Sequence, residues 1–232
     1  MRFLNLRLAL AVGVLTIVIL GPCAMLAQEA RATGAADSRT EEIEWTWEVR
    51  PDHANAALPN VLLLGDSITR YYFPEVKKEL EGVANVYLMA SSTSLGDPRI
   101  GPHIEEFARA EGVSFRVVHF NNGMHGWAYS EAEYGASFAS FLAEIRKVAP
   151  GAGLIWANTT PVRKDKLPGP TNARVDARNV IAAEAVKGIL VDDQHGLMMG
   201  HGDLYQDDVH FNEAGAAIQG KQAAGLIRGL LK

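Results

Sequence analysis

Short apolar runs alternate with longer segments of helical periodicity from about residue 60 to the C-terminus. The runs lack the polar alternation of a half-exposed strand, so we expect strands that are buried on both faces. The predicted strands cover residues 61–64, 83–89, 115–120, 154–157 and 189–191. The predicted helices cover residues 68–82, 100–110, 131–148, 172–187 and 212–231.

Helices placed between buried strands imply right-handed crossovers and a parallel sheet. The pattern therefore predicts an α/β fold, a three-layer α/β/α sandwich with about five parallel strands. In such sheets ligands bind beyond the carboxyl ends of the strands. The residues that follow each predicted strand are thus the first candidates for a functional site.

The first 27 residues have the pattern of a secretory signal peptide. Arg2 and Arg7 precede an apolar run over residues 8–20, and small residues follow up to Ala27. The run is short for a membrane span, which needs about 20 residues; an uncleaved anchor and a lipoprotein attached at Cys23 are the alternatives. We expect a periplasmic or secreted protein with no stable membrane insertion after cleavage. The expected organisation is a signal peptide at 1–27, a disordered tether and N-terminal extension at 28–57, and one folded domain at 58–232.

The composition of the chain argues against several classes of partner, metal site and cofactor. The chain has 232 residues and a formal net charge of −5, with no Lys/Arg-rich run, which argues against nucleic acid as a main partner. A single cysteine excludes a disulfide framework and multi-cysteine metal sites. No dinucleotide fingerprint or phosphate loop is present, and no cofactor is expected.

The first candidate block, Gly65-Asp66-Ser67-Ile68-Thr69, follows the first predicted strand. Gly65 permits a sharp turn, and Ser67 opens a helix whose N-terminal N–H groups favour negative charge. A serine in this position is also a common helix cap, so the block alone leaves a purely structural role open.

The second block, Asp207-Asp208-Val209-His210, precedes the last predicted helix. In a tight loop, Asp207 can reach Nδ1 of His210 and leave Nε2 to face a hydroxyl from elsewhere. This is the orienting and basic half of a serine–histidine–aspartate triad. A surface loop that leads to a cap at Asn212, and a metal site made with Asp208, are the alternatives.

The two blocks together resemble the SGNH hydrolases, the GDSL-like lipase/esterase superfamily. The resemblance runs from about Asn60 to the C-terminus, with both blocks in the family's chain order. It implies a flavodoxin-like fold in which Ser67 is the nucleophile, His210 the general base and Asp207 its partner.

The blocks between them depart from the family pattern. The family has Gly-x-Asn-Asp after the third strand and uses that asparagine in the oxyanion hole. Alignment on Gly123 puts His125 at that position, with Asn121 and Asn122 as further donors. The family also uses a backbone N–H after the second strand, here from Gly96 or Ser92. The expected oxyanion hole therefore draws on the N–H of Ser67, on His125, Asn121 and Asn122, and on Gly96.

The resemblance implies hydrolysis of a carboxylic ester through an acyl-enzyme. Tryptophans at positions 45, 47, 127 and 156 are candidates for stacking on sugars, although Trp156 lies in a strand and is expected in the core. We expect a small-molecule or glycan ester as substrate, with short acyl groups such as acetyl on a carbohydrate. The alternatives are a lipase or thioesterase for longer chains, an acyltransferase, and a noncatalytic carbohydrate-binding envelope protein.

Several other side chains have two interpretations. Trp45 and Trp47 either cover apolar surface or form a substrate platform. His119 is expected as a satisfied core residue. The loop residues His195, His201 and Arg163 are candidates for lining the pocket. The sequence gives no prediction of the oligomeric state.

Overall fold

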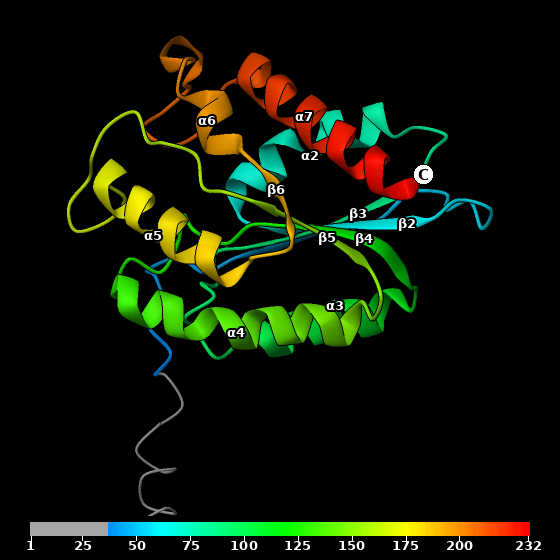
Figure 1. Cartoon of the computed structure of the whole chain (residues 1–232), viewed down its shortest axis with the longest axis horizontal. Coiled ribbons are helices and arrows are strands. Elements are labelled where there is room, and N and C mark those ends of the chain that lie inside the picture. Colours follow the sequence, from blue (N-terminus) through cyan, green and yellow to red (C-terminus); the bar gives the residue numbers. More distant parts are fainter. Residues whose placement is uncertain (1–36) are drawn as a thin grey trace, which may run out of the picture. The chain divides into compact units, whose positions relative to one another are not determined.

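A six-stranded sheet forms the middle layer of the computed structural model, which describes residues 37–232 (Figure 1). The strands are β1 (Thr46–Val49), β2 (Asn60–Gly65), β3 (Asn85–Ser91), β4 (Phe115–Phe120), β5 (Gly153–Ala157) and β6 (Leu190–Asp192). Their order is β1-β3-β2-β4-β5-β6, and all neighbours pair in parallel except β1 and β3. The expected signal peptide at 1–27, with Cys23, and residues 28–36 of the expected tether and N-terminal extension lie outside the described residues.

Helices cover both faces of this sheet (Figure 1). They are α2 (Ser67–Glu79), α3 (Ile100–Glu111), α4 (Glu131–Val148), α5 (Asn172–Ala185), α6 (Gln194–Met198) and α7 (Glu213–Leu231). Helices α3, α4 and α5 contribute to one apolar core, and α2 and α7 contribute to the other. Within residues 37–232, no helix combines the length and the apolar character that a membrane span requires.

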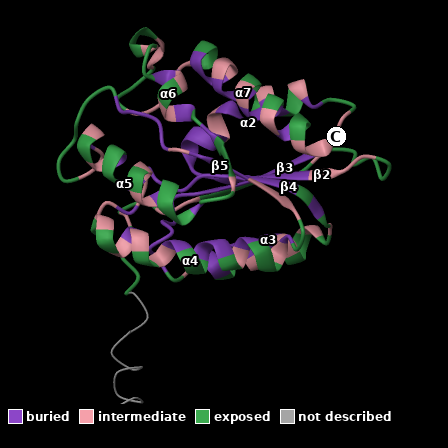
Figure 2. Ribbon diagram, viewed as in Figure 1, coloured by how far each residue is buried: buried purple, intermediate pink, exposed green. Residues whose placement is uncertain are grey.

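Four consecutive residues of strand β2, Val61 to Leu64, are apolar because they face two cores. Leu62 and Leu64 enter the core beneath α3 and α4, whereas Val61 and Leu63 enter the core beneath α2 and α7. Successive side chains of a strand point to opposite faces, so a strand between two helical layers needs apolar residues at every position. The buried strands and the half-exposed helices of Figure 2 follow this rule. The predicted α/β/α sandwich is confirmed.

The sheet has one more strand than the sequence pattern indicated. Strand β1 pairs antiparallel with β3, with Trp47 opposite Ala90 and Thr46 opposite Ser91. The strand spacing of Trp45 and Trp47 was visible in the sequence, but their pairing partner was not. Because β1 lies at the edge beside β3, the N-terminal segment is brought to the carboxyl end of that strand. Ser38 and Arg39 hydrogen-bond there to Asp97 and Tyr129.

Candidate active site

Ser67 lies where β2 turns directly into α2. A side chain on Gly65 would collide with Thr69, so glycine lets the strand pass into the helix without a longer loop. Asp66 is the N-cap, and its Oδ1 accepts a hydrogen bond from the N–H of Ile68 at 2.9 Å. The cap fixes the first turn of the helix and places Ser67 at its amino end, with 8% of the residue exposed.

Asp207 and His210 lie in a tight loop before α7. The N–H of Gln206 donates to the carbonyl of His210 at 2.9 Å, and the ring of Phe211 stacks on Tyr205 at 4.2 Å. The loop after β5 holds it from outside, since the N–H of Arg163 donates to the carbonyl of Asp208 at 2.9 Å. This bracing fixes the loop against the end of the sheet.

The three side chains meet although 143 positions separate Ser67 from His210. His210 Nε2 lies 2.7 Å from Ser67 Oγ, and His210 Nδ1 lies 2.9 Å from Asp207 Oδ2. The ring of Tyr71 packs on the imidazole at a centroid distance of 4.8 Å. The structure therefore brings together the three residues that the two sequence blocks singled out, in the order hydroxyl, imidazole, carboxylate.

The Asp207 carboxylate is held in its charged form. Burial acts to raise its pKa, but the N–H groups of His210 and Val209 and the His210 ring outweigh burial and lower the pKa. Its Oδ1 accepts both N–H groups, at 2.7 and 2.8 Å, which leaves Oδ2 for the imidazole. An ionised carboxylate in this position fixes the proton of His210 on Nδ1 and leaves Nε2 free to accept one from Ser67.

His125 is held by a residue of the N-terminal segment. Its Nδ1 lies 3.0 Å from Glu41 Oε2, and the N–H of Gly126 donates to Glu41 Oε1 at 3.1 Å. Nε2 of His125 is buried and has no hydrogen-bond partner within residues 37–232. Gly126 has a φ of +69°, a left-handed conformation that glycine adopts without strain.

Negative charges surround the ring of His125. Burial acts to lower its pKa, but the hydrogen bond to Glu41 and the negative charges of Asp66, Glu41 and Glu44 outweigh burial and raise the pKa. The ring of Trp45 lies 5.8 Å from the His125 ring and 5.2 Å from the guanidinium carbon of Arg70 on α2. For Glu41, burial acts to raise the pKa, but the bonds from His125 and Gly126 lower it.

The other oxyanion candidates have partners of their own. Asn122 accepts from the N–H of Leu95 at 2.8 Å and donates to the carbonyl of Thr93 at 3.0 Å. Asn121 donates to the carbonyl of Ala157 at 2.7 Å. The N–H of Gly96 donates to Ser94 Oγ at 3.2 Å, and the N–H of Ser92 to the carbonyl of Trp45 at 3.1 Å. These groups tie the loops after β3, β4 and β5 together.

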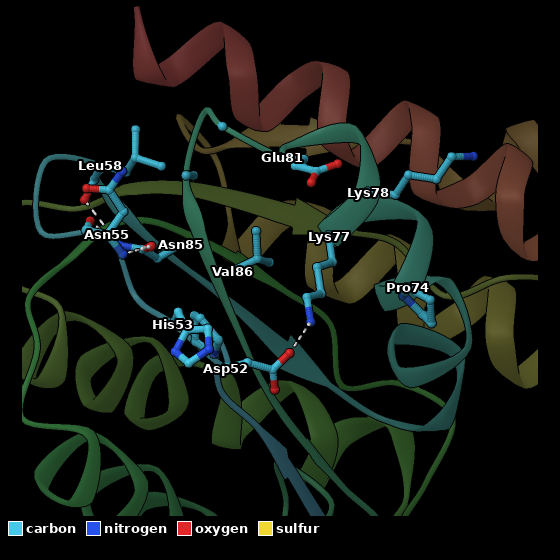
Figure 3. A pocket seen from close by; sticks show the side chains of 13 residues that line it. Asp52, His53, Asn55, Leu58, Pro74, Lys77, Lys78, Glu81, Asn85 and Val86 are labelled. Carbon is cyan, nitrogen blue, oxygen red and sulfur yellow. Dashed lines mark hydrogen bonds and ion pairs between the residues drawn. The ribbon is translucent and has the colours of Figure 1, made fainter.

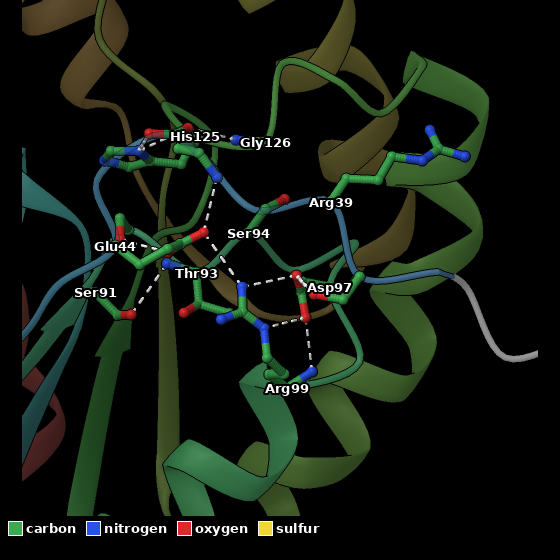
Figure 4. A network of polar contacts seen from close by, with 12 residues as sticks. Arg39, Glu44, Ser91, Thr93, Ser94, Asp97, Arg99, His125 and Gly126 are labelled. Carbon is green, nitrogen blue, oxygen red and sulfur yellow. Dashed lines mark hydrogen bonds and ion pairs between the residues drawn. The ribbon is translucent and has the colours of Figure 1, made fainter.

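A polar network extends from these loops to the N-terminal segment (Figure 4). Arg99 bonds both oxygens of Asp97 at 2.9 Å and reaches Glu44 at 3.2 Å. Glu44 also accepts from the hydroxyl of Ser92 at 2.7 Å. The network fixes the segment between Ser38 and β1 against the edge of the site.

The remaining sequence candidates have separate environments. His119 lies in the core as expected, but it is only half satisfied: Nε2 lies 2.7 Å from Asp192 Oδ2, and Nδ1 is buried without a partner within residues 37–232. Trp156 is 3% exposed in the core. Arg163 and His195 line a hollow of about 490 Å³ beside Met198. His201 lies at the 3-10 turn of Gly202–Leu204. Trp127 packs against Arg178, whose guanidinium carbon lies 4.0 Å from the ring centroid.

A further hollow of about 600 Å³ lies at the other end of the sheet (Figure 3). It is bordered by the start of β3 at Asn85 and by the last turn of α2, where Lys77 pairs with Asp52 at 3.6 Å. Since the triad lies at the carboxyl ends of the strands, this hollow belongs to the opposite edge.

Sequence reasoning missed three residues that contact the site. Glu41 bonds His125, Tyr71 packs on His210, and Arg178 donates to the carbonyl of His125 at 2.7 Å. The helical spacing of Tyr71 from Ser67, one turn along α2, was a signal that could have found it. Glu41 and Arg178 lie 84 and 53 positions from His125, with no local motif to link them.

No family model matches the sequence, and no curated protein matches it. Solved structures do match. A carbohydrate esterase of family 3 from Talaromyces cellulolyticus is 16% identical, with a TM-score of 0.59 over 75% of this chain and 98% of the other. The C-terminal catalytic domain of peptidoglycan O-acetyltransferase A from Streptococcus pneumoniae is 18% identical, with a TM-score of 0.54 over 75% and 94%.

A member of the lipolytic G-D-S-L family from Veillonella parvula is 18% identical, with a TM-score of 0.57 over 72% of this chain and 97% of the other. Nearly the whole of each matched chain is covered, so the likeness extends to complete domains. At sequence identities of 16–18%, these comparisons establish the fold of the chain. The chain has the fold of the SGNH hydrolases, with a serine, a histidine and an aspartate facing one another at the carboxyl end of its sheet.

Proposed function

We propose that this protein is a serine esterase that hydrolyses carboxylic esters through an acyl-enzyme. The observation that carries the proposal is the continuous contact from Asp207 through His210 to Ser67, at 2.9 and 2.7 Å. Both distances are within hydrogen-bond reach, which nucleophile activation by a general base requires.

In the proposed reaction, Ser67 Oγ attacks the ester carbonyl while His210 Nε2 takes its proton. Asp207 keeps the imidazole oriented and stabilises the imidazolium that forms. The tetrahedral intermediate collapses, and His210 gives its proton to the departing alcohol. Water then attacks the acyl-enzyme with His210 again as base, which releases the acid and restores Ser67.

The oxyanion hole of this proposal consists of the Ser67 N–H and His125 Nε2–H. Ser67 N–H lies at the amino end of α2, where the helix dipole favours a developing negative charge. Asn121, Gly96 and Ser92 are left out because their donors are already bonded within the loops. Asn122 is left out because both ends of its amide are anchored, on the N–H of Leu95 and the carbonyl of Thr93. His125 is favoured because its Nε2 is buried without a partner.

Short acyl groups on a carbohydrate are the substrates that we propose. The matched structures include a carbohydrate esterase, an acetyl esterase and a peptidoglycan O-acetyltransferase. Acyl transfer to a sugar is the second candidate, favoured by the last of these. The leader sequence supports export to the periplasm or the exterior, where acetylated polysaccharides are accessible.

The first test compares the wild-type protein with Ser67→Ala on 4-nitrophenyl acetate and on longer acyl chains. We expect turnover that falls with chain length and drops by about six orders of magnitude in the variant. Ser140→Ala, which changes an exposed serine of α4, is the matched control and should retain full activity. Equal turnover by Ser67→Ala and wild type would contradict the proposal. Acetate transfer to an added oligosaccharide, in place of release, would favour the transferase.

A further inference from the structure

Arg70 lies within a group of three aromatic rings beside the triad. Its guanidinium carbon is 5.2 Å from the ring centroid of Trp45, 5.1 Å from Trp47 and 5.6 Å from Tyr71. Aromatic faces attract a guanidinium through their quadrupole and hold its plane in place. Trp45 and Trp47 come from β1 and its approach, whereas Arg70 and Tyr71 belong to α2. The N-terminal segment thus fixes a cation on the nucleophile's own helix.

The guanidinium N–H groups of Arg70 have no acceptor among residues 37–232. Its backbone N–H donates to the carbonyl of Asp66 at 3.0 Å within α2, but in that part of the chain its guanidinium makes no hydrogen bond and no ion pair. Arg39 and Arg99, by contrast, bond carboxylates at 2.6 and 2.9 Å. Glu48, the acidic residue next to Trp47, points to the other face of β1 and lies 3.8 Å from Arg50. The guanidinium of Arg70 therefore keeps its donors available to a ligand.

The guanidinium of Arg70 lies close to the residues of the proposed triad. Arg70 follows Ser67 by three residues, which is close to one helical turn and about 5 Å along α2. The ring of Tyr71, over which the guanidinium lies, packs in turn on His210 at 4.8 Å. A group bound at Arg70 is thus separated from the catalytic imidazole by one aromatic ring. A sugar that carries the ester, or its neighbour in a chain, spans such a separation.

We propose that Arg70 and Trp47 form a subsite for a carboxylate-bearing sugar, so that the preferred substrate is an acylated acidic glycan. A guanidinium fork matches a carboxylate with two parallel hydrogen bonds. Trp47 is 52% exposed, and its open face can stack on a sugar ring. This inference rests on the proposed esterase function, and it specifies in addition that the substrate carries a negative charge.

The test compares two acetylated trisaccharides, one of galacturonate and one of xylose, with the full chain and its variants. We expect wild type to prefer the acidic ester and Arg70→Gln to lower the ratio of the two kcat/KM values about tenfold, through KM. Added salt should lower the wild-type ratio as well. Arg109→Gln, an exposed arginine of α3, is the matched control and should keep the wild-type ratio. A ratio unchanged in Arg70→Gln would overturn the subsite.

A binding measurement separates this inference from the esterase proposal. Calorimetry with Ser67→Ala and unacetylated trigalacturonate needs no turnover. We expect binding that weakens about tenfold when Arg70→Gln is added, and weaker binding of xylotriose. Binding without any ester hydrolysis by wild type would support the subsite and contradict the esterase. Hydrolysis that depends on Ser67, with equal binding of both sugars, would support the esterase and contradict the subsite. Melting curves of each variant show whether it is folded.

Discussion

At the scale of single residues, the contact between His125 and Glu41 means that His125 can donate to an oxyanion only when both of its ring nitrogens are protonated. Glu41 accepts from Nδ1, so the donor toward an oxyanion has to be Nε2–H, and both nitrogens carry protons only in the imidazolium. The pKa of His125 is raised, so the imidazolium persists above the ordinary value of about 6.5. When pH rises through that raised pKa, the remaining proton stays on Nδ1 beside the carboxylate, and Nε2 loses its donor.

We therefore expect kcat/KM to fall on the alkaline side as His125 loses its proton. Loss of one oxyanion donor costs about a hundredfold in rate, which sets the size of the alkaline fall. The measurement is acetate release from an acetylated oligosaccharide as a function of pH. A rate that stays constant through the alkaline range would show that His125 is not the donor.

Glu41→Gln changes this profile in a way that a structural role would not. The N–H of Gly126 donates to Oε1, so it would orient the new amide with its NH2 group toward His125. Nδ1 then accepts, and neutral His125 keeps its proton on Nε2. We expect a lower maximum rate and the loss of the alkaline fall. Glu42→Gln, an exposed neighbour, should keep the wild-type profile, and the idea fails if both variants share one profile.

At the scale of elements, the buried side chain of Arg178 on α5 holds the loop between β4 and α4 by hydrogen bonds. Arg178 is fully buried and donates to the carbonyls of Gly123, His125 and Gly126 at 3.1, 2.7 and 2.9 Å. Burial lowers its pKa to about 10, although nearby negative groups oppose this. The arginine thus holds the segment that carries His125 through its carbonyls, with the Glu131 carboxylate 3.8 Å from its Nε.

Arg178→Met should preserve much of the side-chain volume but leave these carbonyls without a donor. Buried unsatisfied groups cost about 1–3 kcal/mol each, so we expect the free energy of unfolding to fall by about 3 kcal/mol or more. For a domain of this size, that lowers Tm by roughly 10 °C. Thermal unfolding measures the change, and Arg146→Met on the exposed face of α4 is the control. Equal melting temperatures would mean that water satisfies the carbonyls.

The same scale shows what could be predicted from sequence. Strand β4 and helix α4 match their predicted bounds of 115–120 and 131–148, because local signals mark their ends. Ser130 and Glu133 form a capping box at the start of α4, for example. Strand β1 was harder to predict from the sequence, since its partner β3 lies about 40 residues away. The pairing register of a four-residue edge strand depends on contacts that no local pattern encodes.

At the scale of the whole molecule, the site divides into a predictable and an unpredictable half. Ser67, Asp207 and His210 belong to short blocks at strand and helix ends, and the order of the elements brings them together. Glu41 and the tryptophans that surround Arg70 come from the N-terminal segment. The path of that segment over the domain follows from tertiary contacts, such as those of Arg39 with Glu133 at 2.6 Å.

This division gives the last prediction. A chain that begins at Gln28, the expected mature N-terminus, keeps Glu41, Trp45 and β1, whereas a chain that begins at Pro51 lacks all three. We expect the first to hydrolyse acetyl esters at the full rate. The second should lose at least about tenfold in kcat/KM, because His125 loses its orienting carboxylate. It should also melt several degrees lower, since β3 becomes an unpaired edge. Acetate release and thermal unfolding measure the two effects. Full activity of the shorter chain would show that the N-terminal segment covers the domain but takes no part in its chemistry.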